Sequence, residues 1–123
     1  AAILGLDDAV VVEICAEAAE DEVVSAVNFN SPGQVVIAGN KAAVDRAMEL
    51  CKAKGAKRAL PLAVSVPSHC ALMKPAAERF ADSVNAIEWK APQIPVVQNV
   101  TAAVAADLDL SLIHISEPTR PER

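Results

Sequence analysis

Apolar residues in the first half of the chain recur at two spacings, which predicts alternating strands and helices. A short apolar run or an apolar residue at about every second position indicates a strand, and one at about every third or fourth position indicates a helix. The pattern predicts strands over 1–6, 23–29, 34–38 and 60–64, and helices over 8–19 and 41–54. This order is that of the split βαβ, ferredoxin-like motif. We therefore predict an α+β fold, with two helices on one face of an antiparallel sheet.

Residues with special backbone preferences stand at these boundaries. Asp7 and Asn40 precede the two helices, where their side chains can act as N-caps. Gly55 follows the second helix, as expected of a residue that ends a helix in the left-handed conformation. The sequence Asn-Ser-Pro-Gly over 30–33 is a turn signal, so the strands that flank it are predicted to form a hairpin. Pro61 favours an edge position or a bulge for the last strand because proline has no amide N–H.

The second half has a different pattern. A helical stripe is formed by Leu72, Ala76, Phe80 and Val84. Pro75 indicates that this helix starts or kinks nearby, and the apolar segment 94–97 predicts a short buried strand. A helix followed by one strand cannot bury itself alone. We therefore expect a complete subdomain over 1–66 and, over 67–109, a truncated piece of a larger α/β domain.

Composition narrows the possible functions. The chain has 123 residues and is 53% hydrophobic, which suits one folded domain with a core. Its net charge is −5 and only 2% of its residues are aromatic. Nucleic-acid binding needs clustered cations and stacking platforms, so we expect no nucleic-acid partner.

The cysteines indicate a reducing compartment. There are three, an odd number, at Cys15, Cys51 and Cys70, with no Cys-x-x-Cys spacing and no histidine at metal-ligand spacing. They fit reduced thiols of a cytoplasmic protein, with no metal site. No apolar run has transmembrane length and no leader pattern is present, so no membrane partner is expected. The first residue is Ala1 and not methionine, which suggests that the natural start is missing.

His69 is the candidate catalytic residue. It follows Pro67 at a break between an extended run and a helical run, and loops between rigid elements often carry reactive side chains. From the local sequence alone, a structural or surface role for this histidine is favoured over a catalytic one. A catalytic histidine needs a nucleophile, and Cys70 is a poor one because adjacent residues at a helix start point apart.

Two motifs resemble those of a known protein family. Residues 28–39 read NFNSPGQVVIAG and residues 66–69 read VPSH. Together they resemble the bacterial malonyl-CoA:acyl carrier protein transacylases, and the resemblance runs from residue 1 to about residue 100. In that family a ferredoxin-like subdomain is inserted into an α/β-hydrolase-like acyltransferase domain. The resemblance therefore implies an acyltransferase of fatty acid biosynthesis, with malonyl-CoA as substrate, acyl carrier protein as partner and no cofactor.

The resemblance also implies site residues. His69 matches the base of a serine–histidine pair that works by ping-pong acyl transfer. Asn28 and Gln34 match the part of the small subdomain that faces the acyl pocket. Arg58 matches a basic position suited to coenzyme A phosphates or to the acidic carrier protein. From the residues alone, Asn28 also fits turn chemistry, Gln34 an outward strand position and Arg58 a solvated edge.

The chain departs from the family pattern in what it lacks. It contains no Gly-His-Ser-x-Gly nucleophile elbow and no counterpart of the arginine that pairs the malonate carboxylate. We therefore expect this fragment to be inactive by itself. Two alternatives stay open: a non-catalytic ferredoxin-like binding or regulatory module, and an acyltransferase domain of a multidomain polyketide-type synthase.

The last residues carry a separate resemblance. Residues 110–120 read LSLIHISEPTR, which resembles the in-frame translation of an adapter used in sequencing libraries. This resemblance implies that 110–123 is a non-native tail and that His114 has no function.

Overall fold

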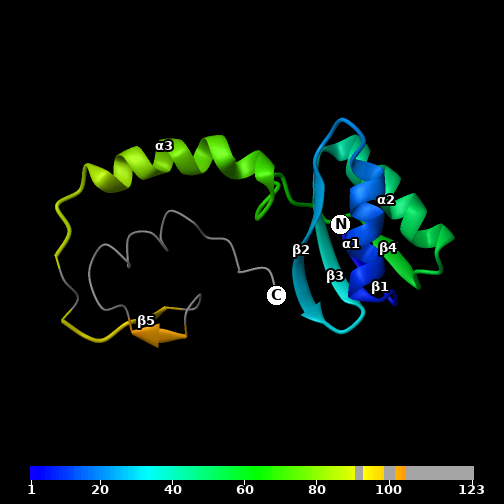
Figure 1. Cartoon of the computed structure of the whole chain (residues 1–123), viewed down its shortest axis with the longest axis horizontal. Coiled ribbons are helices and arrows are strands. Elements are labelled where there is room, and N and C mark those ends of the chain that lie inside the picture. The colour runs from blue at the N-terminus through cyan, green and yellow to red at the C-terminus, as the bar shows by residue number, and fades with distance from the viewer. Residues whose placement is uncertain (91–92, 99–101, 105–123) are drawn as a thin grey trace. The chain divides into compact units, whose positions relative to one another are not determined.

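The computed structural model describes residues 1–90, 93–98 and 102–104 (Figure 1). The chain divides into two compact units between Met73 and Lys74, and each is described by itself. The predicted limits of 1–66 and 67–109 stay a prediction, and the predicted tail 110–123 lies outside the described residues.

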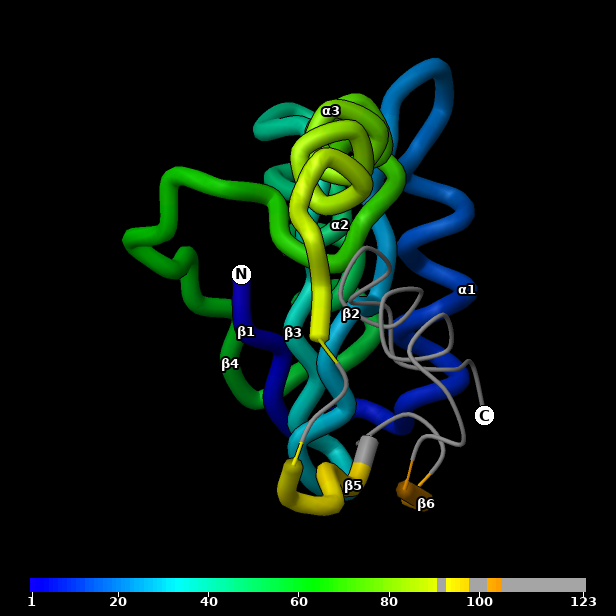
Figure 2. The backbone as a smooth tube through the Cα atoms, turned by 90° about the vertical axis from the view of Figure 1, so that its left-hand side faces the viewer, coloured from blue at the N-terminus to red at the C-terminus, as the bar shows by residue number. Residues whose placement is uncertain are grey.

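The first unit is a four-stranded antiparallel sheet with two helices, so this part of the chain is a mixed α/β fold. Its elements are β1 (Ala2–Leu4), α1 (Asp8–Ala19), β2 (Val24–Ser31), β3 (Gln34–Gly39), α2 (Lys41–Ala53) and β4 (Arg58–Leu60). The strand order is β2-β3-β1-β4, and every neighbouring pair is antiparallel. Figure 2 shows the four strands side by side in this order. The predicted element order of this unit is confirmed.

One face of the sheet packs against both helices and forms the core. Ile3 pairs with Val35 on one side and with Ala59 on the other, and all three are buried. The helices contribute their own buried stripes, with Val11, Ile14, Cys15 and Ala18 from α1 and Ala43, Ala47, Met48 and Cys51 from α2. Each large aliphatic side chain buried in this core stabilises the fold by about 1.5–3 kcal/mol. Neither helix of the first unit covers the opposite side of the sheet, the open face.

The hairpin of β2 and β3 is confirmed, with a tighter turn than predicted. β2 continues through Ser31, so only Pro32 and Gly33 form the connection. Gly33 has a φ of 73°, which glycine adopts without strain. The ladder also shifts register twice, between Ala26 and Asn28 and again between Phe29 and Ser31. Each shift is a bulge that adds one residue to β2.

The predicted capping by Asp7 and Asn40 is only half right. Both residues occupy the N-cap positions, but neither side chain bonds to its own helix. The Asn40 Oδ1 instead accepts a hydrogen bond of 2.9 Å from the Val23 N–H. The Asn40 backbone N–H donates to the Val23 carbonyl at 2.7 Å, so this side chain ties the helix start to the sheet. Gly55 is confirmed as the residue that ends α2, with a φ of 97°.

The strand predicted over 60–64 is wrong beyond its first residue. β4 ends at Leu60, and residues 61–64 are outside any strand. Pro61 supplies no N–H for the ladder, and β4 is indeed an edge strand with only β1 as neighbour. Leu62 and Val64 are accordingly 44% and 66% exposed.

The second unit follows a short 3₁₀ turn, η1 (Ala71–Met73), and contains one helix and one small hairpin. These elements are α3 (Lys74–Asn85), β5 (Val97–Gln98) and β6 (Ala103–Val104). Pro75 stands in the first turn of α3, so the predicted helix start is confirmed. Within α3, only Val84 of the predicted stripe is buried, and Phe80 is 51% exposed.

The predicted buried strand at 94–97 is also wrong. Ile94 and Val97 are 77% and 64% exposed, and β5 pairs antiparallel with β6. The described part of this unit offers no further sheet that could bury β5. A lone pair of strands leaves both of its faces open, which is why these side chains stay exposed.

Candidate functional site

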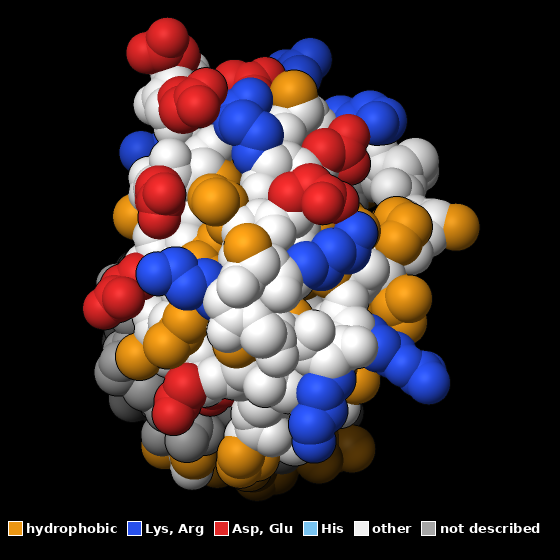
Figure 3. Space-filling model, turned by 90° about the vertical axis from the view of Figure 1, so that its right-hand side faces the viewer, with side chains coloured by type: hydrophobic (Ala, Val, Ile, Leu, Met, Phe, Trp, Pro, Cys, Tyr) orange, Lys and Arg blue, Asp and Glu red, His pale blue; other side chains and the backbone are white. Residues whose placement is uncertain are grey.

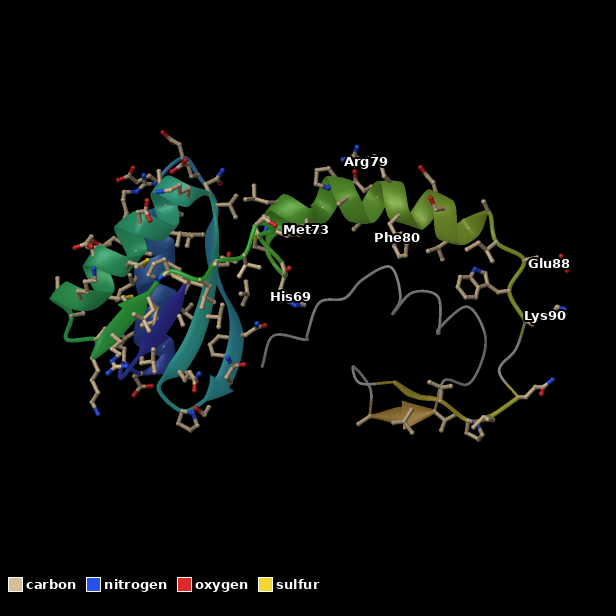
Figure 4. All side chains as sticks on the ribbon, turned by 180° about the vertical axis from the view of Figure 1, so that it is seen from behind. His69, Met73, Arg79, Phe80, Glu88 and Lys90 are labelled. Carbon is tan, nitrogen blue, oxygen red and sulfur yellow. The ribbon has the colours of Figure 1, made fainter. Side chains whose placement is uncertain are left out.

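His69 stands on the loop between β4 and η1, in a backbone conformation that few residues adopt (Figure 4). Its φ is +64°, in the left-handed region. A residue other than glycine held there costs about 1–3 kcal/mol, and such residues cluster at functional sites. Histidine is among the residues that tolerate this region best. The side chain is exposed, so the loop presents it outward.

Local hydrogen bonds hold this loop in shape. The Ser68 N–H donates to the Val66 carbonyl at 2.9 Å, and the Met73 N–H donates to the Cys70 carbonyl at 3.0 Å. The Cys70 thiol lies 3.1 Å from the Pro67 carbonyl oxygen and donates to it. These short-range bonds form turns on both sides of His69. They also give the Cys70 thiol a structural partner within its own turn.

The predicted substrate-binding residues Asn28, Gln34 and Arg58 all lie on the open face of the sheet. Directly paired residues of an antiparallel ladder project to the same side of the sheet. Leu4 pairs with Gln34 on one side and with Arg58 on the other, which makes one row across three strands. Asn28 pairs with Val36, which is two residues from Gln34 and so shares its face. The structure therefore places all three on one face of the sheet, with Asn28 and Arg58 on its two opposite edge strands.

The three side chains differ in how they are held. The Gln34 Oε1 lies 3.4 Å from the Ser31 hydroxyl, which pairs with it across the ladder. Asn28 is half-buried and Arg58 is exposed, and neither side chain makes a hydrogen bond or ion pair with the residues that the structure describes. Their polar groups are therefore open to a ligand. Ser31 was missed in the sequence because its place opposite Gln34 depends on a bulge.

Two other titratable groups, the thiols of Cys15 and Cys51, are buried in the core. Burial, with a smaller contribution from Cys51, raises the pKa of the Cys15 thiol to about 12. Burial also raises the pKa of Cys51. Both thiols are protonated core groups at neutral pH, as their helical positions predicted. Arg46 fills another structural role, because its Nε donates to the Ala18 carbonyl at the end of α1 at 3.0 Å.

The described residues contain no group of three or more His, Cys, Asp or Glu side chains placed to hold a metal ion. Among these same residues, no helix combines the length and the apolar character required to cross a membrane. On the face shown in Figure 3, acidic and basic side chains are interspersed.

Comparison with known proteins places the chain in a family. The family model for the acyl transferase domain matches residues 2–117. The malonyl CoA-acyl carrier protein transacylase of Escherichia coli K12 is 68% identical over 100 residues, which is 81% of this chain and 32% of that protein. The transacylase of Haemophilus influenzae is 67% identical over 99 residues, covering 80% of this chain and 32% of that protein. The chain thus spans about a third of the length of the curated relatives it matches.

Solved structures agree with the sequence matches. A malonyl-CoA:acyl carrier protein transacylase from Xanthomonas oryzae superposes with a TM-score of 0.85 at 51% identity, over 96% of this chain and 38% of that one. A malonyl-transacylase in complex with a type II PKS acyl-carrier protein gives a TM-score of 0.83 at 55% identity, over 94% and 37%. Sequence and structure together show that this chain belongs to the acyl transferase domain family.

Proposed function

We propose that this chain is part of an enzyme that transfers a malonyl group from malonyl-CoA to the phosphopantetheine thiol of acyl carrier protein, in fatty acid biosynthesis. The observation that carries the proposal is the 68% identity to a malonyl CoA-acyl carrier protein transacylase over 100 residues. In a chain of 123 residues, a match of that length must include Asn28, Gln34, Arg58 and His69.

The mechanism is a two-step acyl transfer with His69 as the base. A serine hydroxyl attacks the malonyl thioester while histidine takes its proton, and coenzyme A leaves with that proton. The thiol of the carrier protein then attacks the acyl-serine, and histidine takes the thiol proton and returns it to the departing serine oxygen. Histidine suits both directions because it titrates near neutral pH as a residue type. The serine comes from a part of the enzyme that this chain does not contain, so the chain alone is inactive.

The other site residues have binding roles in this proposal. Asn28 and Gln34 face the acyl pocket from the open face. Arg58, exposed at the sheet edge, meets coenzyme A phosphates or acidic side chains of the carrier protein, which guanidinium groups bind well. No cofactor is needed, since the acyl group moves between thioester and serine ester without a redox step. The enzyme works in the cytoplasm, where both malonyl-CoA and the carrier protein would be found.

The finer architecture belongs to the same proposal. We infer that residues 1–66 are a ferredoxin-like subdomain and that 67–109 return into an α/β-hydrolase-like domain. The strand order β2-β3-β1-β4 and the crossing connection from β1 through α1 to β2 support the first part.

A labelling experiment tests the proposed division of roles. The 123-residue chain is incubated with radiolabelled malonyl-CoA and analysed for covalent label. We expect none, because the chain supplies the base without the nucleophile. A stable acyl-enzyme that persists in His69→Ala and disappears in Cys70→Ser would overturn both the inactivity of the chain and the structural role of Cys70.

A further inference from the structure

The second bulge of β2 decides which side chain stands beside Gln34. Phe29 is paired with Val35. If the ladder continued from there without a bulge, Asn30 would stand opposite Gln34. The bulge inserts Asn30 as an extra residue and places Ser31 opposite Gln34 instead. Bulges re-aim side chains in this way and are frequent next to active sites.

Ser31 and Gln34 are also in contact. The Ser31 hydroxyl donates toward the Gln34 Oε1 over 3.4 Å. This distance is longer than the roughly 2.7 Å of a strong O–H···O bond, so the contact restrains the amide without locking it. A glutamine amide has one acceptor oxygen and an NH₂ group with two donors. With the oxygen turned toward Ser31, the NH₂ donors are left to face a ligand on the open face.

We infer that Ser31 is a positioning residue for Gln34. Its hydroxyl holds the Gln34 amide in the orientation that offers N–H donors, which suits an acceptor oxygen of the acyl substrate. The consequence for catalysis rests on the proposed function, whereas the orientation of Gln34 is a property of the hairpin itself. The two can therefore be tested separately.

The orientation is tested on the 123-residue chain by ¹⁵N relaxation of the Gln34 side-chain NH₂ group. Four proteins are compared: the unchanged chain, Ser31→Ala, Ser31→Thr and the control Ser25→Ala. Ser25 lies on the same strand and its hydroxyl makes no hydrogen bond with the residues that the structure describes. We expect Ser31→Ala to lower the side-chain order parameter toward flexible values below about 0.6. Threonine keeps the hydroxyl and should restore it, and Ser25→Ala should change nothing.

Two results would overturn the inference. One is a Gln34 side chain that is equally ordered, or equally mobile, in the unchanged chain and in Ser31→Ala. The other is an equal loss of order in the backbone amides of 31–34, which would mean that Ser31 only stabilises the turn. Adding malonyl-CoA gives the separate test of function. If it shifts other resonances of the first unit and leaves the Gln34 side-chain resonance unmoved in every variant, Gln34 does not contact the substrate, while the positioning by Ser31 still stands.

Discussion

The backbone of His69 is the most specific single-residue feature of the proposed site. The sequence predicted its place after a proline break, but it did not predict the left-handed φ of 64° within a loop that local hydrogen bonds hold. The pairing of Ser31 with Gln34 could not be predicted from the sequence either, because it depends on a bulge that the pattern of apolar residues does not indicate. At this scale, sequence identifies residue types and positions, whereas backbone conformation needs the folded neighbours.

The left-handed conformation predicts how substitutions at His69 affect stability. His69→Asn should keep the free energy of unfolding within about 0.5 kcal/mol, because asparagine tolerates this region. His69→Val should lower it by about 1–2 kcal/mol, since a β-branched side chain crowds its own carbonyl there. Urea unfolding of both variants measures the difference. Equal stability of the two variants would mean that the loop relaxes out of this conformation.

The buried Cys15 thiol predicts a pH dependence of stability. Its pKa rises from an ordinary value of 9.0 to about 12 in the folded chain. Between these values the unfolded chain loses this proton and the folded chain keeps it. The free energy of unfolding should therefore be intact below pH 9 and fall as the pH rises toward 12. Urea titrations of the unchanged chain and of Cys15→Ala give the slopes to compare. An unchanged slope in Cys15→Ala would assign the loss to other groups.

At the scale of the elements, the periodic and turn signals were the reliable ones. Both helices of the first unit and the β2–β3 hairpin lie where apolar spacing and the Pro-Gly turn placed them. The failures share a cause, which is that tertiary partners decide whether an apolar run is paired and buried. Alternation over 60–64 resembled a strand, yet Pro61 removed a ladder bond and β4 stopped at Leu60. The side chain of Asn40 likewise found a better partner in Val23 than in its own helix.

Two glycines, Gly39 at the end of β3 and Gly55 after α2, predict different losses of stability when a side chain is added. A Cβ on Gly39 would lie 2.0 Å from the Val23 carbonyl oxygen, so the two strands would have to separate. Gly39→Ala should therefore lower the free energy of unfolding by about 2–3 kcal/mol. No atom lies within 4 Å of a Cβ placed on Gly55, so only its φ of 97° disfavours a side chain there. Gly55→Ala should therefore lower the free energy of unfolding by about 1 kcal/mol. Chemical denaturation of both variants checks the order, and a larger loss for Gly55→Ala would contradict the packing at Gly39.

At the scale of the whole molecule, the chain is about a third of its curated relatives in length. The first unit has its own core beneath two helices, whereas α3 and β5 carry exposed apolar side chains such as Phe80 and Val97. The proposed site residues Asn28, Gln34, Arg58 and His69 all lie in the first unit. In the proposed reaction the first unit would supply the base and a binding face, and the serine nucleophile would come from outside this chain. We therefore propose that this segment supports malonyl transfer when the rest of an acyl transferase domain is supplied.

A chimeric enzyme tests whether this segment supports malonyl transfer. The matching 100-residue segment of the Escherichia coli transacylase, 68% identical, is replaced by its counterpart from this chain, and malonyl transfer from malonyl-CoA to acyl carrier protein is measured. The chimera should be active, and His69→Ala within it should lose about 10²–10⁴-fold in kcat/KM, the usual contribution of a general base. Asn28→Ala, which removes one proposed binding group and no general base, should leave the fold intact and weaken substrate use far less. A folded chimera whose His69→Ala variant transfers malonyl as fast as its parent would contradict the account.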